Sequence, residues 1–76
     1  RSGLRLTLEV PETKDGVMAL AQAISELGGT IVSVGSFYGE EPGKRGLVVK
    51  VQDVKKGQVV DRLETLVDHV LDARDV

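Results

Sequence analysis

The chain has 76 residues, and its ten basic and twelve acidic side chains give a net charge of −2. A domain this small buries only a marginal core, and with one Phe, one Tyr and no Trp that core has to be aliphatic. The charge balance argues against a general binder of nucleic acid or anionic membrane, which would carry a clear basic excess. The absence of cysteine excludes disulfides, thiolate metal ligands and thiol catalysis.

The first half of the chain shows two periods of hydrophobicity. Residues 4–10, LRLTLEV, alternate between apolar and polar side chains, which predicts a half-buried strand that Pro11 ends. Apolar residues then recur three and four apart, as in an amphipathic helix, at Val17, Leu20, Ile24 and Leu27. Gly28 is typical of the left-handed cap that ends such a helix. Residues 30–38, TIVSVGSFY, are rich in β-branched and aromatic residues and predict a second strand.

The second half continues with a hairpin, a helix and a strand. Residues 39–46, GEEPGKRG, predict a turn, and residues 47–52, LVVKVQ, predict a third strand paired with the second. We expect its apolar residues Leu47, Val49 and Val51 to face inward. A second helix is predicted to begin between Val54 and Gln58, with an apolar stripe at Val59, Val60, Leu63, Leu66 and Val67. Residues 69–76, HVLDARDV, predict a short last strand.

This order of elements predicts an α+β fold, a ferredoxin-like βαββαβ sandwich. Right-handed crossovers would put two helices on one face of a four-stranded antiparallel sheet, with the second strand at an edge. The other face would carry mostly polar residues, namely Arg5, Thr7, Glu9, Val48, Lys50 and Gln52. Residues 1–76 form a single domain. Because the chain has no initiator Met and its first strand starts by Leu4, we expect a fragment of a longer protein.

Several activities known for this fold lack their residues here. RNA binding needs stacking aromatics on the third strand, but residues 45–51, RGLVVKV, have none. Metal transport needs a CxxC motif, and the single histidine, His69, is more typical of a surface position than of a metal ligand. An acylphosphatase-like hydrolase needs an arginine in the first loop and an asparagine, and the chain has no asparagine. We therefore expect no enzyme activity, no metal site and no nucleic-acid partner.

Two features leave a structural and a functional interpretation open. Lys44 and Arg45 beside the hairpin turn either belong to a solvated loop or hold an anionic ligand or an acidic patch of a partner domain. At the start of the first helix, Asp15 either caps the helix while Gly16 completes a tight turn, or Gly16 lets a ligand approach. A carboxylate or phosphate suits such a helix start, because its N–H groups are free.

The whole chain from about Leu4 to Val76 resembles an ACT domain. The family's first loop ends in D-x-P-G before an apolar helix, and residues 13–16, TKDG, precede VMALAQAISELGG here. Residues 29–33, GTIVS, are similar to the family's g-x-N-I-x-S entry into the second strand. The run GTIVSVGSFYGEEPGKRGLVVKV and the ending VLDARDV are most similar to ACT domains that follow paired CBS domains in acetoin-utilisation-type proteins. Three positions depart from the family pattern, with Thr13 for an acidic residue, Asp15 for proline and Thr30 for asparagine.

The resemblance implies a non-catalytic regulatory module without a cofactor. We expect it to bind a small molecule, an amino acid, at the interface of a homodimer joined through edge strands, and so to control an attached CBS or other domain. The implied ligand-binding residues are Asp15, Gly16, Val17 and Met18 of one chain, facing Thr30, Ile31 and Ser33 of the other. The three departures favour an alternative, a ligand-free dimerisation and assembly module of a CBS-domain protein.

The cellular setting is inferred from what the sequence lacks. No apolar run approaches the roughly 20 residues of a membrane span, and no signal-peptide pattern opens the chain. We therefore expect no membrane partner and a cytoplasmic location. The similarity to CBS-linked members also hints at an adenine nucleotide bound elsewhere in the parent protein.

Overall fold

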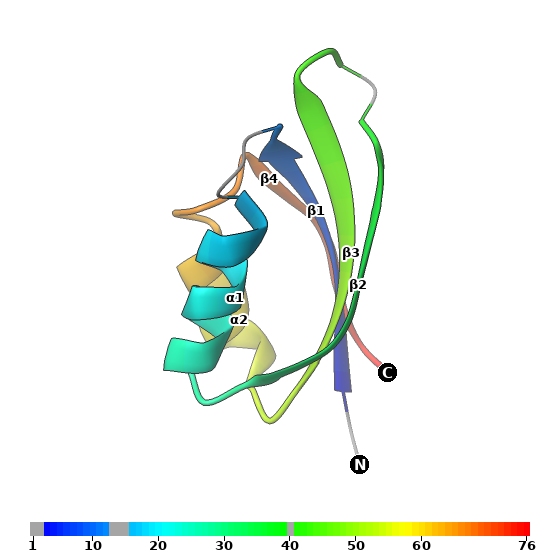
Figure 1. Ribbon diagram of the computed structural model, residues 1–76. Helices are drawn as coiled ribbons and strands as arrows, with labels where there is room; N and C mark the ends of the chain where they lie inside the picture. The colour runs from blue at the N-terminus through cyan, green and yellow to red at the C-terminus, as the bar shows by residue number, and fades with distance from the viewer. Residues whose placement is uncertain (1–2, 13–15, 40) are drawn as a thin grey trace.

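The computed structural model describes residues 3–12, 16–39 and 41–76, and it has the predicted βαββαβ order (Figure 1). The sheet has four strands in the order β2-β3-β1-β4, and all three neighbouring pairs are antiparallel. Both helices lie on the same side of the sheet (Figure 1). The predicted fold class is therefore confirmed. The elements are β1 (Gly3–Pro11), α1 (Gly16–Glu26), β2 (Thr30–Tyr38), β3 (Lys44–Gln52), α2 (Lys56–Leu63) and β4 (His69–Asp75).

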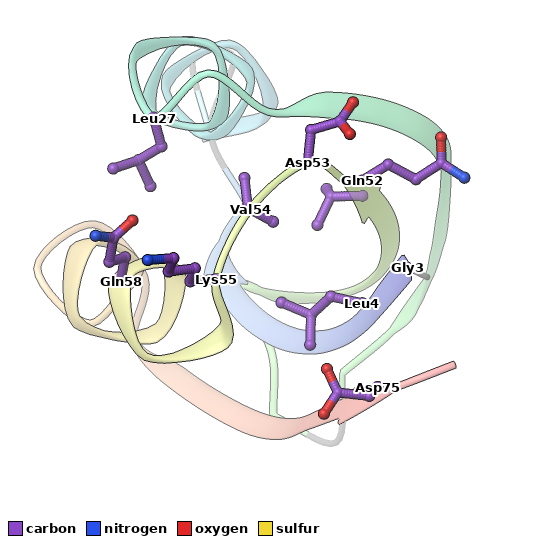
Figure 2. Close-up of a pocket in the computed structure, with 10 residues that line it drawn as sticks. Gly3, Leu4, Leu27, Gln52, Asp53, Val54, Lys55, Gln58 and Asp75 are labelled. Atoms are coloured by element: carbon purple, nitrogen blue, oxygen red, sulfur yellow. The ribbon is translucent and has the colours of Figure 1, made fainter. Parts of the chain in front are cut away.

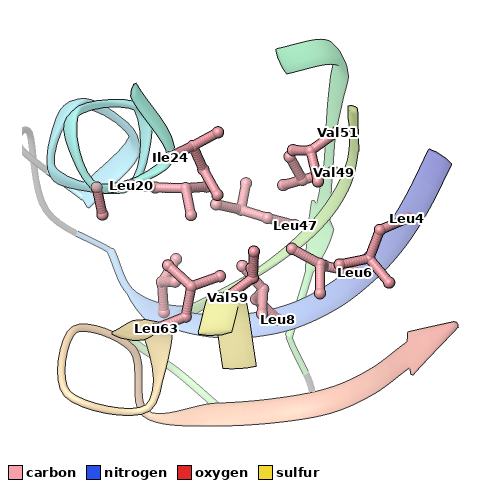
Figure 3. Packing of buried hydrophobic residues seen from close by; sticks show 12 residues of the cluster. Leu4, Leu6, Leu8, Leu20, Ile24, Leu47, Val49, Val51, Val59 and Leu63 are labelled. Carbon is pink, nitrogen blue, oxygen red and sulfur yellow. The ribbon is translucent and has the colours of Figure 1, made fainter. Parts of the chain in front are cut away.

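The core is the aliphatic layer between the sheet and the helices. Every second residue of β1 and β3 points into it, because side chains alternate between the two faces of a strand. Leu20 and Ile24 of α1 lie over β3, and Val59 and Leu63 of α2 lie over β1 (Figure 3). The fully buried side chains are Leu6, Leu8, Leu20, Ile24, Leu47, Leu63, Val49, Val51 and Val59. The inward orientation predicted for the third strand is confirmed.

The turn between α1 and β2 depends on two glycines. Gly28 has a φ of 80°, the left-handed conformation predicted for the helix cap. At Gly29, an added Cβ would lie 2.4 Å from Cγ1 of Val54 and 2.9 Å from Cγ2 of Ile24. Any side chain at position 29 would therefore push α1 away from the segment between β3 and α2.

Three details of the sequence prediction were wrong. The turn predicted for residues 39–46 is shorter, since Lys44 and Arg45 already pair with Pro11 and Val10 of β1. The second helix ends at Leu63, so that the apolar residues predicted in its last turn, Leu66 and Val67, lie beyond it. Val17, predicted in the buried stripe of α1, is 38% exposed at the first turn of the helix.

Candidate functional site

The first half of the predicted ligand site lies at the start of α1. Gly16 is the first residue of this helix and is partly buried, while Val17 and Met18 are exposed. Met18 is 72% exposed, so its side chain is available for contact with another molecule. Asp15, predicted as the cap, lies outside the described residues.

The second half of the predicted site lies at the start of β2. Thr30 and Ser33 are exposed and Ile31 is partly buried. The register of β2 against β3 shifts between Ile31 and Ser33, since these residues pair with the neighbours Val51 and Lys50. This β-bulge leaves Val32 unpaired and 49% exposed at the edge of the sheet.

Within one chain, the two halves of the predicted site lie at opposite ends of the folded domain. The helix α1 has 11 residues, which separates its first residue from the start of β2 by about 16 Å at 1.5 Å per residue. Figure 1 shows the start of α1 toward the end of the molecule where β2 and β3 are joined, and the start of β2 at the other end. One small molecule cannot touch both groups within one chain.

The two edges of the sheet differ in how they are protected. The edge strand β4 carries charged residues at Asp72, Arg74 and Asp75, and its register against β1 shifts between Thr7 and Leu8. Charges and bulges of this kind hinder pairing with a further strand. The other edge strand, β2, has nine residues and no charged side chain. Its apolar residues Val32, Val34 and Phe37 are 49%, 43% and 43% exposed.

The hairpin end of the molecule holds a hollow of about 380 Å³, lined by Glu12, Ser36, Phe37, Tyr38, Lys44 and Arg45. The sequence suggested that Lys44 and Arg45 either are solvated or hold an anion. Lys44 donates a hydrogen bond to Asp68, which raises the pKa of Lys44 above its usual value. Arg45 lies 3.8 Å from the Glu12 carboxylate. Because a carboxylate partly neutralises each cation, this pair is less suited to bind an anion.

A second hollow, of about 360 Å³, lies at the opposite end between the end of α1 and the start of α2 (Figure 2). Leu4, Leu27 and Val54 form its apolar wall, and Asp53, Lys55 and Asp75 stand at its rim (Figure 2). The described residues of the predicted site do not line it. Charges of both signs at the rim give this hollow no clear preference for one class of ligand.

The described part of the chain lacks a cluster of side chains suited to a metal ion. Across residues 3–12, 16–39 and 41–76, no group of three His, Asp or Glu side chains could hold a metal ion. The His69 side chain is 69% exposed, and its Nε2 atom lies 4.0 Å from Oε1 of Glu9. Among the same residues, no helix is long and apolar enough to span a membrane.

The sequence matches the family model of the TTHA0829-like ACT domain over residues 2–74. The chain belongs to the ACT domain family. The resemblance inferred from the loop before α1 and from the start of β2 is thereby confirmed at the level of the family. A comparison with curated proteins finds no matching relative.

Solved structures with this ACT fold come from several enzymes. Formyltetrahydrofolate deformylase of Burkholderia mallei superposes with a TM-score of 0.71 at 12% identity, over 100% of this chain and 27% of that protein. The regulatory subunit of aspartate kinase from Thermus thermophilus gives 0.65 at 14% identity, over 99% of this chain and 49% of the subunit. The ACT domain of GTP pyrophosphokinase from Chlorobium tepidum superposes with a TM-score of 0.52 at 12% identity, over 99% of this chain and 95% of that domain.

This ACT domain spans between a quarter and a half of the deformylase and the kinase subunit. At such low identity these structures establish the fold of this chain, and the ligands and partners of those proteins cannot be assigned to it. The family model places the domain in the ACT family, and one of the proteins that share its fold is a kinase regulatory subunit. These matches give no specific support for the CBS-linked branch of the family.

Proposed function

We propose that this ACT domain is a non-catalytic sensor that binds an amino acid between two copies of the chain and controls an attached domain. The binding residues are Asp15 to Met18 of one copy and Thr30, Ile31 and Ser33 of the other. The observation that carries the proposal is the β2 edge, which is long, apolar and uncharged, whereas the β4 edge is charged and bulged. Such an exposed edge calls for a covering strand, and β2 of a second copy can supply it.

The placement of the two predicted half-sites supports a site shared between chains. If two β2 strands pair antiparallel about Val34, the start of each strand meets the end of the other. Thr30 then lies opposite Tyr38 of the partner subunit, at the hairpin end where that chain's α1 begins. The start of α1 and the start of β2 are separated by about 16 Å within one chain. The pairing brings the start of α1 of one chain to the start of β2 of the other.

The chemistry of the two half-sites suits an amino acid. The first N–H groups of α1 have no partner within the helix and favour the α-carboxylate of a ligand. The Thr30 and Ser33 hydroxyls can accept hydrogen bonds from its ammonium group. Control of an attached domain follows if the ligand binds one arrangement of the pair better, and the coupling cannot exceed that difference in affinity.

The alternative, a ligand-free assembly module of a CBS-domain protein, uses the same β2 edge. The observation in its favour is Thr30, because a threonine hydroxyl replaces the asparagine amide with which many members of the family hold a ligand. A hydroxyl offers one donor and one acceptor oxygen on a bond that rotates, whereas an amide offers two donors and an acceptor oxygen in a fixed plane. Under this alternative the chain dimerises whether or not an amino acid is present.

An amide-resolved NMR titration with each of the L-amino acids separates the two functions. The sensor predicts saturable shifts, with one dissociation constant, at both Gly16–Met18 and Thr30–Ser33. Shifts at neither segment in a folded, dimeric chain would favour the assembly module. Adenine nucleotides serve as a second panel.

A further inference from the structure

The helix-free face of the sheet contains a row of four residues that crosses all its strands. Phe37 of β2 pairs with Gly46 of β3, Gly46 pairs with Glu9 of β1, and Glu9 pairs with His69 of β4. Residues paired in this way lie about 5 Å apart on one face. An aromatic ring, a residue without a side chain, a carboxylate and an imidazole therefore follow one another across the sheet.

The glycine in this row leaves space that Phe37 occupies in part. An added Cβ at Gly46 would lie 2.1 Å from Cζ of the Phe37 ring, so the ring covers Gly46. Beside the ring there is a hollow of about 230 Å³, lined by Glu9, Phe37, Tyr38, Gly39, Gly46 and Leu71. This volume is below that of a site for a drug-sized molecule and suits a group of a few heavy atoms.

Among the described residues that line this hollow, Glu9 carries the only formal charge. Its side chain is only 20% exposed, and in the described part of the chain no side chain donates a hydrogen bond to its carboxylate. The nearby Lys44 ammonium donates its hydrogen bond to Asp68 and acts on Glu9 only through the attraction between their charges. His69 lies 4.0 Å from Glu9, beyond hydrogen-bond distance. A largely covered carboxylate to which no described side chain donates a hydrogen bond favours a cation with N–H donors.

We propose that this hollow binds the ammonium group of a small primary amine. The ammonium donates hydrogen bonds to Glu9 and lies against the Phe37 ring, whose negative face attracts cations. The alkyl chain of the amine packs on Leu71. This site lies on the sheet face opposite the helices, so it does not use the start of α1 and does not rest on the sensor function proposed above.

The test is an amide-resolved NMR titration of the 76-residue chain with n-butylammonium chloride at constant ionic strength. We expect saturable shifts at the amides of Glu9, Gly46 and Leu71, with a dissociation constant in the millimolar range. Glu9→Gln keeps the shape of the side chain and removes its charge, and it should raise this constant at least tenfold. Phe37→Leu should raise it several-fold, since the aromatic face is lost.

Two controls make the outcome decisive. Glu64→Gln removes an exposed carboxylate beyond the end of α2, outside the hollow, and should leave the dissociation constant unchanged. n-Butanol has nearly the same shape as the amine without its charge and should cause no saturable shift. Absence of saturation with the amine, equal shifts with butanol, or unchanged affinity in Glu9→Gln would each overturn the proposal.

Discussion

Asp72 and Arg74 form a surface pair on the charged edge strand. Arg74 Nε donates a hydrogen bond of 2.7 Å to Asp72 Oδ2, and mainly for this reason the pKa of Asp72 lies below its ordinary 3.8. A carboxyl group whose pKa is lower in the folded chain stabilises the fold above its unfolded pKa. That contribution is lost as the pH falls through the folded value.

We therefore predict that the Asp72 carboxyl group titrates with a midpoint below 3.8 when it is followed by ¹³C NMR. Arg74→Gln should move the midpoint upward, because it removes the donor that stabilises the carboxylate. A midpoint that does not respond to this substitution would show that the hydrogen bond is absent in solution.

Gly16 offers the sharpest residue-scale test of the proposed sensor site. Gly16→Leu places a bulky side chain where the ligand would approach the first N–H groups of α1, and we expect at least a tenfold loss of amino-acid affinity in the titration. Gly57→Leu is the matched control, because it lies in the first turn of the other helix and its added Cβ meets nothing within 4 Å. Equal affinities in the two variants would remove Gly16 from the site.

Gly46 has a structural role that can be measured separately from ligand binding. Gly46→Ala forces the Phe37 ring off the sheet, and we expect it to lower the free energy of unfolding by about 1 kcal/mol in urea denaturation. Gly35→Ala, on the neighbouring strand, adds a Cβ with nothing within 4 Å and should cost less. In a Phe37→Leu background the cost of Gly46→Ala should shrink. An undiminished cost there would assign the effect to the backbone.

At the scale of elements, the β2 edge is the feature that the proposed dimer requires. Val34→Lys puts a charge at the middle of this strand, where Val34 is 43% exposed, and should shift the chain to a monomer in sedimentation velocity. Leu71→Lys adds the same charge to the other edge strand, where Leu71 is 55% exposed, and should leave the dimer intact. A dimer that persists in Val34→Lys would show that the chains pair elsewhere.

The sequence predicted the elements well because their periods are clear. The strict alternation of β1 and β3, and the spacing of Leu20 and Ile24 in α1, place the same residues in the core that the structure buries. The end of α2 could not be predicted from hydrophobicity. The helical spacing of apolar residues continues to Val67, beyond the last residue of α2. Just after the helix, the Thr65 hydroxyl donates a hydrogen bond of 2.8 Å to the carbonyl of Arg62 in its last turn.

The candidate site was less accessible to prediction than the fold. Its two halves were found from their similarity to a family pattern. Within one chain they lie at opposite ends of the folded domain, and hydrophobic periodicity does not indicate that they meet in a dimer. The row from Phe37 to His69 was not foreseen either. Its members are far apart in sequence, and only the register of four strands brings them side by side.

For the whole molecule, the proposed pairing would extend the sheet through β2 and leave the helices of both copies on one face. The helix-free faces would then form a second continuous surface, with one amine-binding hollow in each copy. Amino-acid binding at the interface and amine binding on the opposite face would use different residues. The two ligands can therefore be tested independently on the same sample.

The central claim, that Gly16–Met18 of one chain meets Thr30–Ser33 of another, is tested most directly by isotope-filtered NMR. A sample that mixes labelled and unlabelled chains reports only contacts between copies. The account predicts cross-chain nuclear Overhauser effects from the Met18 methyl group to Thr30 and Ile31 of the partner subunit. A dimer whose cross-chain contacts arise from the helix-free face, or from β4, would contradict it.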